Sequence, residues 1–137
     1  MAELDERNAR NAKVIEEFRA NRGQTTGRTN LLLLTHTGAK SGKQRTNPLV
    51  YLPDAGRVVL FASKGGGPTN PDWYHNIVAN PRVTVEVGAE KYEARAVVVT
   101  GNERDELFAR QVQAAPVFGE YQVKTPRSIP VIVLERV

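Results

Sequence analysis

Apolar and polar residues follow one another in short blocks that predict one helix at the start of the chain and several strands after it. Between residues 4 and 20, Ile15 and Phe18 recur at helical spacing. The carboxylates of Glu16 and Glu17 fall on the opposite side, which predicts an amphipathic helix. The remainder of the chain carries shorter patterns that are typical of strands.

Six strands are predicted from runs of leucine, β-branched and aromatic residues. Residues typical of turns separate these runs. Their expected ranges are 31–35, 46–52, 57–63, 82–87, 91–99 and 129–135. In the fourth, apolar and polar residues alternate at every second position, so one face of that strand should be buried. Six short strands with few helices favour an antiparallel barrel or an α+β, mainly β, sheet.

Two further helices are expected between the strands. Residues 23–27 form a loop after the first helix, and a second helix opens with Asn70 as N-cap and Pro71 at its first position. Pro81 ends that helix.

The third helix follows a capping box formed by Thr100 and Glu103. Residues 115–127, which contain prolines and a glycine, are expected to be a loop. We assign 1–27 to the N-terminal helix and its loop, and 28–137 to the barrel, as one structural domain.

Composition excludes several classes of protein. The 137 residues suit a single compact domain, and the absence of cysteine removes disulfides and zinc–thiolate sites. With two histidines, no metal site is expected. No apolar run reaches the roughly 18 residues needed to span a bilayer, and the charged N-terminus is unlike a signal peptide. We therefore expect a cytoplasmic protein without a transmembrane segment, and leave contact with a membrane surface open.

Net charge is +4, which suits an anionic partner. Positive charge is concentrated only at Lys40, Lys43 and Arg45, on a loop hinged by Gly38 and Gly42. Such cations, together with loop amides, can hold phosphate or carboxylate oxygens. The spacing differs from a nucleotide P-loop, which has four residues between its glycines and Ser or Thr after its lysine. A solvated hairpin is the alternative interpretation.

Three motifs resemble one known family. They are T-G-A-K-S-G-K-Q-R-T-N-P-L-V-Y over 37–51, A-S-K-G-G over 62–66 and N-P-D-W-Y-H-N over 70–76. In this order they resemble the deazaflavin-dependent nitroreductases, the flavin/deazaflavin oxidoreductases of class A. The resemblance implies a six-stranded split β-barrel of the flavin-reductase or FMN-binding type, with coenzyme F-420 (8-hydroxy-5-deazaflavin) as cofactor. It also implies hydride transfer from the reduced coenzyme to small electrophiles such as nitroaromatics, enones or quinones.

The resemblance further implies where the coenzyme binds. Its phosphate should lie at one set of residues: Ala39, Lys40, Ser41 and Arg45. Its ring and ribityl chain should contact two strands: Thr46, Asn47, Pro48, Leu49 and Val50, then Phe61, Ala62, Ser63 and Lys64. The short helix should add Asp72, Trp73, Tyr74, His75 and Asn76. Phe118 is also assigned to the coenzyme site, at a position where relatives carry a tyrosine.

Tyr121 and Ser63 are the catalytic candidates. By the resemblance, Tyr121 lies near the substrate, where its phenol would hydrogen-bond the oxygen that gains charge. Tyr121 as a packing residue is the alternative. Trp73 taken alone is a core anchor, and Asn47 alone is a strand-start residue. His36 lies in an apolar strand and is expected to be buried, without an assigned role.

Two other functions stay open. An FMN-binding split-barrel reductase would carry a yellow, oxygen-reactive chromophore. A noncatalytic barrel could bind nucleic acid through its basic loop. Its strands lack the aromatic platform needed for base stacking, because only Tyr51, Phe61 and Tyr92 lie on them, separated by apolar residues, so no nucleic-acid partner is expected. A monomer is favoured, because nothing resembles a long dimerisation strand or a heptad repeat.

Overall fold

The computed structural model describes residues 2–23 and 30–137. Most of the expected loop over 23–27, and the boundary between the segments 1–27 and 28–137, lie outside the described residues. The helices are α1 (Ala2–Ala20), α2 (Asp72–Ala79), α3 (Gly101–Ala114) and α4 (Val117–Lys124), with a 3-10 turn η1 (Lys64–Gly66). Within the described part of the chain, no helix is long and apolar enough to cross a bilayer.

Seven strands form one antiparallel sheet. They are β1 (Leu31–Thr37), β2 (Gln44–Val50), β3 (Leu52–Asp54), β4 (Arg57–Phe61), β5 (Arg82–Val87), β6 (Glu90–Val99) and β7 (Val131–Arg136), in the order β2-β1-β5-β6-β7-β4-β3. The prediction of six strands is wrong at one place: the expected strand 46–52 is two strands, β2 and β3, that join different parts of the sheet.

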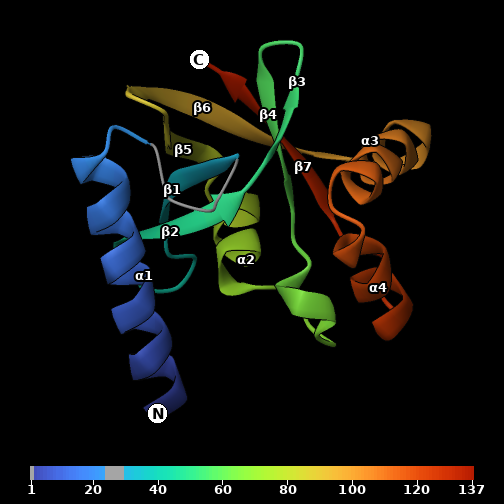
Figure 1. Ribbon diagram of the computed structural model, residues 1–137, viewed down its shortest axis with the longest axis horizontal. Helices are drawn as coiled ribbons and strands as arrows, with labels where there is room; N and C mark the ends of the chain where they lie inside the picture. Colours follow the sequence, from blue (N-terminus) through green and yellow to red (C-terminus); the bar gives the residue numbers. More distant parts are fainter. Residues whose placement is uncertain (1, 24–29) are drawn as a thin grey trace.

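The sheet curls because its two edge strands are neighbours in the chain. β2 ends at Val50 and β3 begins at Leu52, so only Tyr51 separates the two edges. The Tyr51 N–H donates to Asn30 O at 2.9 Å and not to β3. The result is a half-barrel, with α1 on one side, α3 and α4 on the other, and α2 between them (Figure 1).

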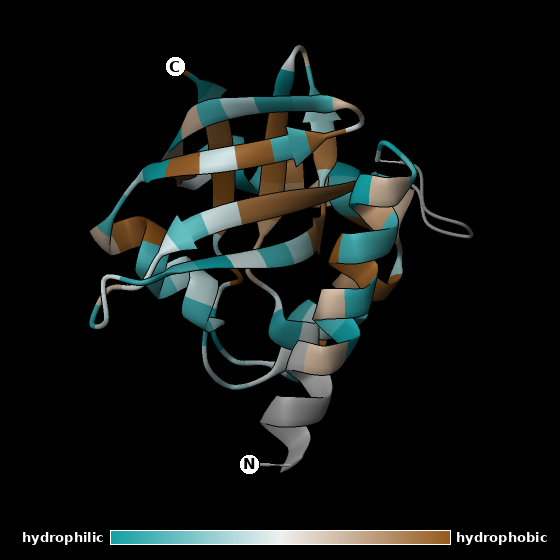
Figure 2. Cartoon of the chain, turned by 90° about the vertical axis from the view of Figure 1, so that its left-hand side faces the viewer, coloured by the Kyte–Doolittle hydropathy of each residue, from teal (hydrophilic) through white to brown (hydrophobic). Residues whose placement is uncertain are grey.

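Several strands are buried on both faces, which explains their unbroken apolar runs. In β1, Leu32 and Leu34 point into the half-barrel, while Leu31 and Leu33 pack against α1 at Phe18. The strand β7 is divided in the same way between the interior and the side covered by α3. Figure 2 shows these hydrophobic strands beside a mostly hydrophilic α1.

Two predicted helix starts differ in their capping. Pro71, not Asn70, is the N-cap of α2, because the Asn70 side chain instead accepts a hydrogen bond from Arg127 at 2.6 Å. Thr100 is the N-cap of α3, but its hydroxyl makes no capping bond. Gly101 follows it at φ +64°, which departs from the regular first turn that a capping box needs.

The expected loop over 115–127 contains a helix, α4, so the prediction of two helices beyond the N-terminal one is also wrong. Pro116 stands directly before α4, where a proline is tolerated. Tertiary contacts stabilise this short helix: Gly119 lies against Val112 of α3, and the backbone at Tyr121 lies against Gly66 of η1. Such contacts leave no periodic signal in the local sequence.

Candidate active site

Two cavities adjoin at the open end of the half-barrel. One, which we call the polar cavity, measures about 530 Å³ between α1, β1, β2 and the start of α2. Its lining consists of Asn11, Ala12, Ile15, His36, Arg45, Thr46, Asn47, Lys64, Pro71, Asp72, Trp73 and Asn76. Eight of these twelve residues carry an amide, hydroxyl, imidazole or charged group.

The second, which we call the apolar cavity, measures about 500 Å³ between β2, β4, η1 and α4. It is lined by Pro48, Leu49, Val50, Leu60, Phe61, Ser63, Lys64, Gly65, Pro71, Trp73, Ala115, Val117, Phe118 and Tyr121. Lys64, Pro71 and Trp73 line both cavities, so the two share one wall. Trp73 is only 8% exposed and belongs to the interior core, so it is an anchor and a cavity wall at once.

The structure brings together most of the residues that the motifs single out. Seven of them line the polar cavity: Arg45, Thr46, Asn47, Lys64, Asp72, Trp73 and Asn76. The apolar cavity adds Pro48, Leu49, Val50, Phe61, Ser63, Phe118 and Tyr121. Six line neither cavity: Ala39, Lys40, Ser41, Ala62, Tyr74 and His75. Of these, Ala62 is fully buried in the core, and His75 is exposed on α2.

The cationic loop between β1 and β2 is closed by its own backbone. The Gly38 N–H donates to Lys43 O at 2.8 Å, and the Gly42 N–H to Gly38 O at 3.0 Å. The Ala39 N–H donates to Asn76 Oδ1 at 2.9 Å, which ties the loop to α2. Lys40 and Lys43 lie in this loop and do not line the polar cavity, whereas Arg45, the second residue of β2, does.

His36, to which the sequence assigned no role, lies in the wall of the polar cavity and is 2% exposed. Its Nε2 lies 2.6 Å from Asn47 Oδ1, and its Nδ1 lies 3.1 Å from Asn76 Nδ2. Burial lowers the pKa of His36, and the nearby Arg45 lowers it further against the opposing effects of the Asn47 hydrogen bond and Asp72. The sequence does carry one signal of a role for His36: it is a polar residue that continues the apolar run of β1, at a position where a core residue is expected.

A second residue that the sequence left unassigned, Arg127, holds the turn between the two cavities. Its guanidinium donates to three backbone carbonyl oxygens, of Ala62 at 3.1 Å, Ser63 at 2.8 Å and Gly67 at 3.0 Å. The turn is strained, because Lys64 adopts φ +48°, a left-handed conformation that costs a non-glycine residue about 1–2 kcal/mol. Arg127 therefore stabilises the backbone that places Ser63 and Lys64.

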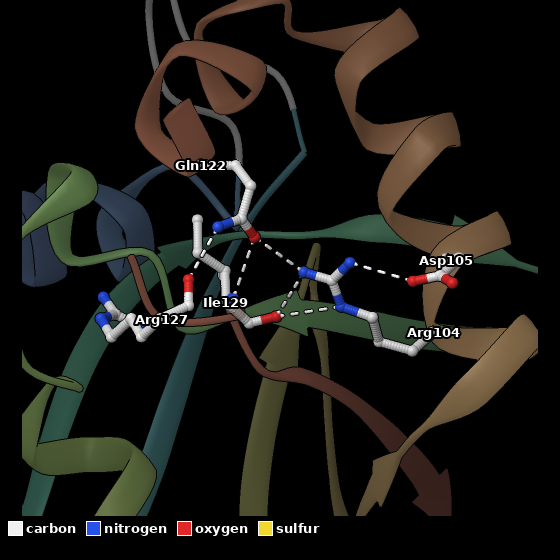
Figure 3. Close-up of polar contacts among 5 residues, drawn as sticks. All are labelled: Arg104, Asp105, Gln122, Arg127 and Ile129. Carbon is white, nitrogen blue, oxygen red and sulfur yellow. Dashed lines mark hydrogen bonds and ion pairs between the residues drawn. The ribbon is translucent and has the colours of Figure 1, made fainter. Parts of the chain in front are cut away.

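The segment 127–129, which leads from Arg127 into β7, is hydrogen-bonded to both α3 and α4 (Figure 3). The Gln122 side chain of α4 donates to Arg127 O at 2.7 Å and accepts from the Ile129 N–H at 3.0 Å. Arg104 of α3 donates to Gln122 Oε1 at 2.9 Å and to Ile129 O at 2.9 Å. These bonds fix α4, and with it the cavity wall at Tyr121.

Aromatic rings line the α4 side of the apolar cavity. Tyr121 meets Phe118 edge to face at 5.2 Å between ring centroids, and Phe118 meets Phe61 of β4 at 6.0 Å. Such contacts fix ring orientation. A flat apolar ligand would therefore meet a preformed aromatic wall that carries one phenol.

Comparison with known proteins identifies the family of this chain. Residues 8–136 match the family described as F420H(2)-dependent quinone reductase. The chain belongs to this family. A protein of Mycobacterium tuberculosis named as an F420H(2)-dependent quinone reductase is 42% identical over 110 residues, which cover 77% of this chain and 72% of that protein.

Two solved structures are also similar. One, described as an F420-H2 dependent reductase, is 43% identical with a TM-score of 0.72, and covers 77% of this chain and 94% of its own. Another, 37% identical with a TM-score of 0.75 over 96% of this chain and 99% of its own, is described as a domain-swapped dimer. The family resemblance predicted from the motifs, and the oxidoreductase class with it, is confirmed. The expectation of a monomer has no support from these relatives.

Proposed function

We propose that this protein is a reductase that uses coenzyme F-420 to reduce a quinone. Family membership supports both the coenzyme and the acceptor. The observation that carries the proposal is the pair of adjoining cavities, one polar and cationic and the other apolar and aromatic, which share the wall at Lys64, Pro71 and Trp73.

The residues present fit the coenzyme. Each cavity has the size of a small-molecule site, for which about 300–1,000 Å³ is usual. The deazaflavin coenzyme joins a planar ring system to a tail that carries a phosphodiester and carboxylates. The apolar cavity offers Leu49, Phe61 and Phe118 to the ring system, and the polar cavity offers cations to the tail.

Arg45 and Lys64 would hold the anionic tail, because charge-assisted hydrogen bonds to phosphate or carboxylate are among the strongest that side chains make. Arg45 can grip such a group with two parallel N–H bonds, whereas Lys64 acts as a point charge. The Thr46 hydroxyl and the Asn47 amide add neutral groups to the same cavity. Ala39, Lys40 and Ser41 lie outside both cavities, so they would contact the coenzyme only at the distal end of its tail.

When bound, the reduced deazaflavin supplies a hydride. The protein orients the acceptor and stabilises the oxygen that gains charge. Ser63 and Tyr121 both line the apolar cavity and carry hydroxyl groups that can donate to that oxygen. Trp73 and Phe118 present aromatic rings to the same space. Nitroaromatics and enones gain charge on an oxygen in the same way and are the alternative acceptors.

The test is a fluorescence titration of the purified protein with oxidised F-420, and in parallel with FMN and FAD. We expect the protein to bind F-420 tightly and to bind neither FMN nor FAD. We also expect it to oxidise reduced F-420 only when a naphthoquinone is added. Binding of FMN in place of F-420, with a yellow chromophore after purification, would favour the FMN-binding reductase instead. A cytoplasmic location and contact with a membrane surface stay predictions from the sequence.

A further inference from the structure

A chain of hydrogen bonds, buried at its centre and part-buried at its ends, connects the cationic loop to the wall of the polar cavity. It begins at the Ala39 N–H, which donates to Asn76 Oδ1 at 2.9 Å. It continues from Asn76 Nδ2 to His36 Nδ1 at 3.1 Å and from His36 Nε2 to Asn47 Oδ1 at 2.6 Å. Four residues from the loop, α2, β1 and β2 therefore share one line of polar contacts.

The direction of this chain is set at its start. A backbone N–H is always a donor, so the Asn76 atom that faces Ala39 is the carbonyl oxygen and the atom that faces His36 is the NH₂ group. His36 Nδ1 must then accept, which leaves Nε2 as the protonated ring nitrogen. Nε2–H donates to Asn47, whose oxygen is consequently turned toward His36.

The charged surroundings of His36 agree with a neutral ring. Arg45 stands opposite His36 in the register of β1 and β2. Protonation would place a second cation beside it and would turn an N–H at Nδ1 toward the Asn76 NH₂ group. Asp72 is the carboxylate near enough to oppose this effect, and burial outweighs it.

We infer that His36 is a positioning residue, which as the neutral Nε2–H tautomer holds the Asn47 amide with its NH₂ group toward the polar cavity. Among the described residues, Asn47 Nδ2 has no hydrogen-bond partner, although Asn47 lines the cavity. A ligand oxygen would meet this donor beside the Arg45 guanidinium. The polar cavity therefore selects a group with at least two acceptor oxygens, such as a phosphodiester; with F-420 as the ligand, this step rests on the proposed function.

The first experiment reads the tautomer without any ligand. Nitrogen chemical shifts of ¹⁵N-histidine-labelled protein should show His36 as the neutral Nε2–H form at pH 7. Asn76→Asp replaces the NH₂ group with an acceptor, so His36 should gain a proton at Nδ1 and titrate at higher pH than in the parent. A parent Nδ1–H tautomer, or an unchanged titration in Asn76→Asp, would overturn the inference.

The second experiment measures binding of oxidised F-420 by fluorescence. His36→Leu removes both ring nitrogens and should weaken binding about tenfold or more, as for one hydrogen bond to a charged group. His36→Gln keeps a donor toward Asn47 and should stay within about threefold of the parent. Asn80→Ala is the matched control, because Asn80 is the C-cap residue just beyond α2, lines neither cavity and reaches β1 at Thr37 O, 3.4 Å away.

The outcomes separate the two proposals. Parent-like binding by a folded His36→Leu protein would remove the positioning role, whereas the proposed function would survive. If the parent protein itself fails to bind F-420, the proposed function is wrong, and so is the proposed contact between Asn47 and the ligand. The NMR result still decides the tautomer of His36 in that case. If His36→Leu does not fold, the shifts of the parent and of Asn76→Asp decide in its place.

Discussion

The polar and apolar cavities differ in how their walls are held. The polar cavity takes its side chains from the β1–β2 hairpin and from α2, and short bonds such as those of His36 connect these neighbours directly. The wall of the apolar cavity at α4 is held from a distance, through Gln122, Arg104 and Arg127. One cavity is therefore built from its own lining, and the other depends on residues that do not touch it.

This difference has a physical consequence for substitutions. In the polar cavity, changes to an exposed lining residue such as Arg45 should alter ligand affinity and leave the fold intact. At the apolar cavity, the residues behind the wall should matter for folding and for turnover together, because α4 is a two-turn helix that packing must stabilise.

The largest effect is expected from Arg127→Met. The guanidinium makes bonds to three carbonyl oxygens and to Asn70 Oδ1, and its removal leaves part-buried acceptors without partners. We expect the free energy of unfolding to fall by about 2–4 kcal/mol, because hydrogen bonds to charged groups contribute about 1.5–3 kcal/mol each and are not additive. Chemical denaturation measures this loss, and reduction of a quinone should fall with it.

Arg82→Met is the control for that experiment. Arg82 pairs with Glu93 at 3.1 Å, and both side chains are 60% exposed, so its loss should change stability by at most about 1 kcal/mol. Equal losses in the two variants would show that Arg127 is an ordinary surface residue and that the wall at η1 does not depend on it.

Arg45→Ala should have the next largest effect, on affinity and not on stability. Since Arg45 lines the polar cavity, we expect F-420 binding to lose about 1.5–3 kcal/mol, with the loss diminishing at high salt. Lys40→Ala, in the loop just before β2 and outside the cavity, should lose less than half as much. Fluorescence titration measures both, and an equal loss in the two variants would place the anionic tail along the loop surface instead.

The same contrast explains what the sequence could predict. Most of the lining of the polar cavity comes from the three contiguous motifs, so the sequence singles out Arg45, Asn47 and Asn76, although not His36 or the residues of α1. Most strands were also predicted, because runs such as 31–35 and 82–87 carry their burial pattern locally. The exception was 46–52, where the break between β2 and β3 depends on which strands pair and not on local preference.

The wall at α4 could not be predicted in the same way. Residues 115–127 have the composition of a loop, and their helix depends on the close approach of Gly66 to Tyr121. Arg127 and Gln122 carry no motif, because their partners lie in distant parts of the chain. The expected burial of His36 is confirmed, but its hydrogen bonds could not be predicted, because an isolated polar residue in an apolar strand says nothing of the two amides that face it.

Tyr121→Phe tests the chemistry of the apolar cavity. If the phenol stabilises the oxygen that gains charge, turnover of a naphthoquinone should fall about tenfold, or about 1.4 kcal/mol of barrier, while F-420 affinity stays within about twofold. Stopped-flow measurement of hydride transfer gives the rate. Tyr92→Phe, a tyrosine of β6 that lines neither cavity, is the control, and an unchanged rate in Tyr121→Phe would make Tyr121 a packing residue.

The smallest expected effect is that of mild acid on the free energy of unfolding, through His36. Because the pKa of His36 is lowered in the folded protein, the unfolded chain binds its proton first, near the usual value of about 6.5. The neutral His36 of the folded protein therefore contributes stability that is fully present above that pH. This stability is lost as the pH falls from the usual pKa to the pKa of the folded protein. We expect the free energy of unfolding to drop by at most about 1.4 kcal/mol between pH 7.5 and 5.5. Asp54, whose pKa is held low by Arg110 and Arg57, acts only in more acidic solution. His36→Gln has no group that titrates there, so denaturation at the two pH values should show a smaller drop in this variant, and equal drops would mean that His36 is protonated as readily in the folded protein as in the unfolded chain.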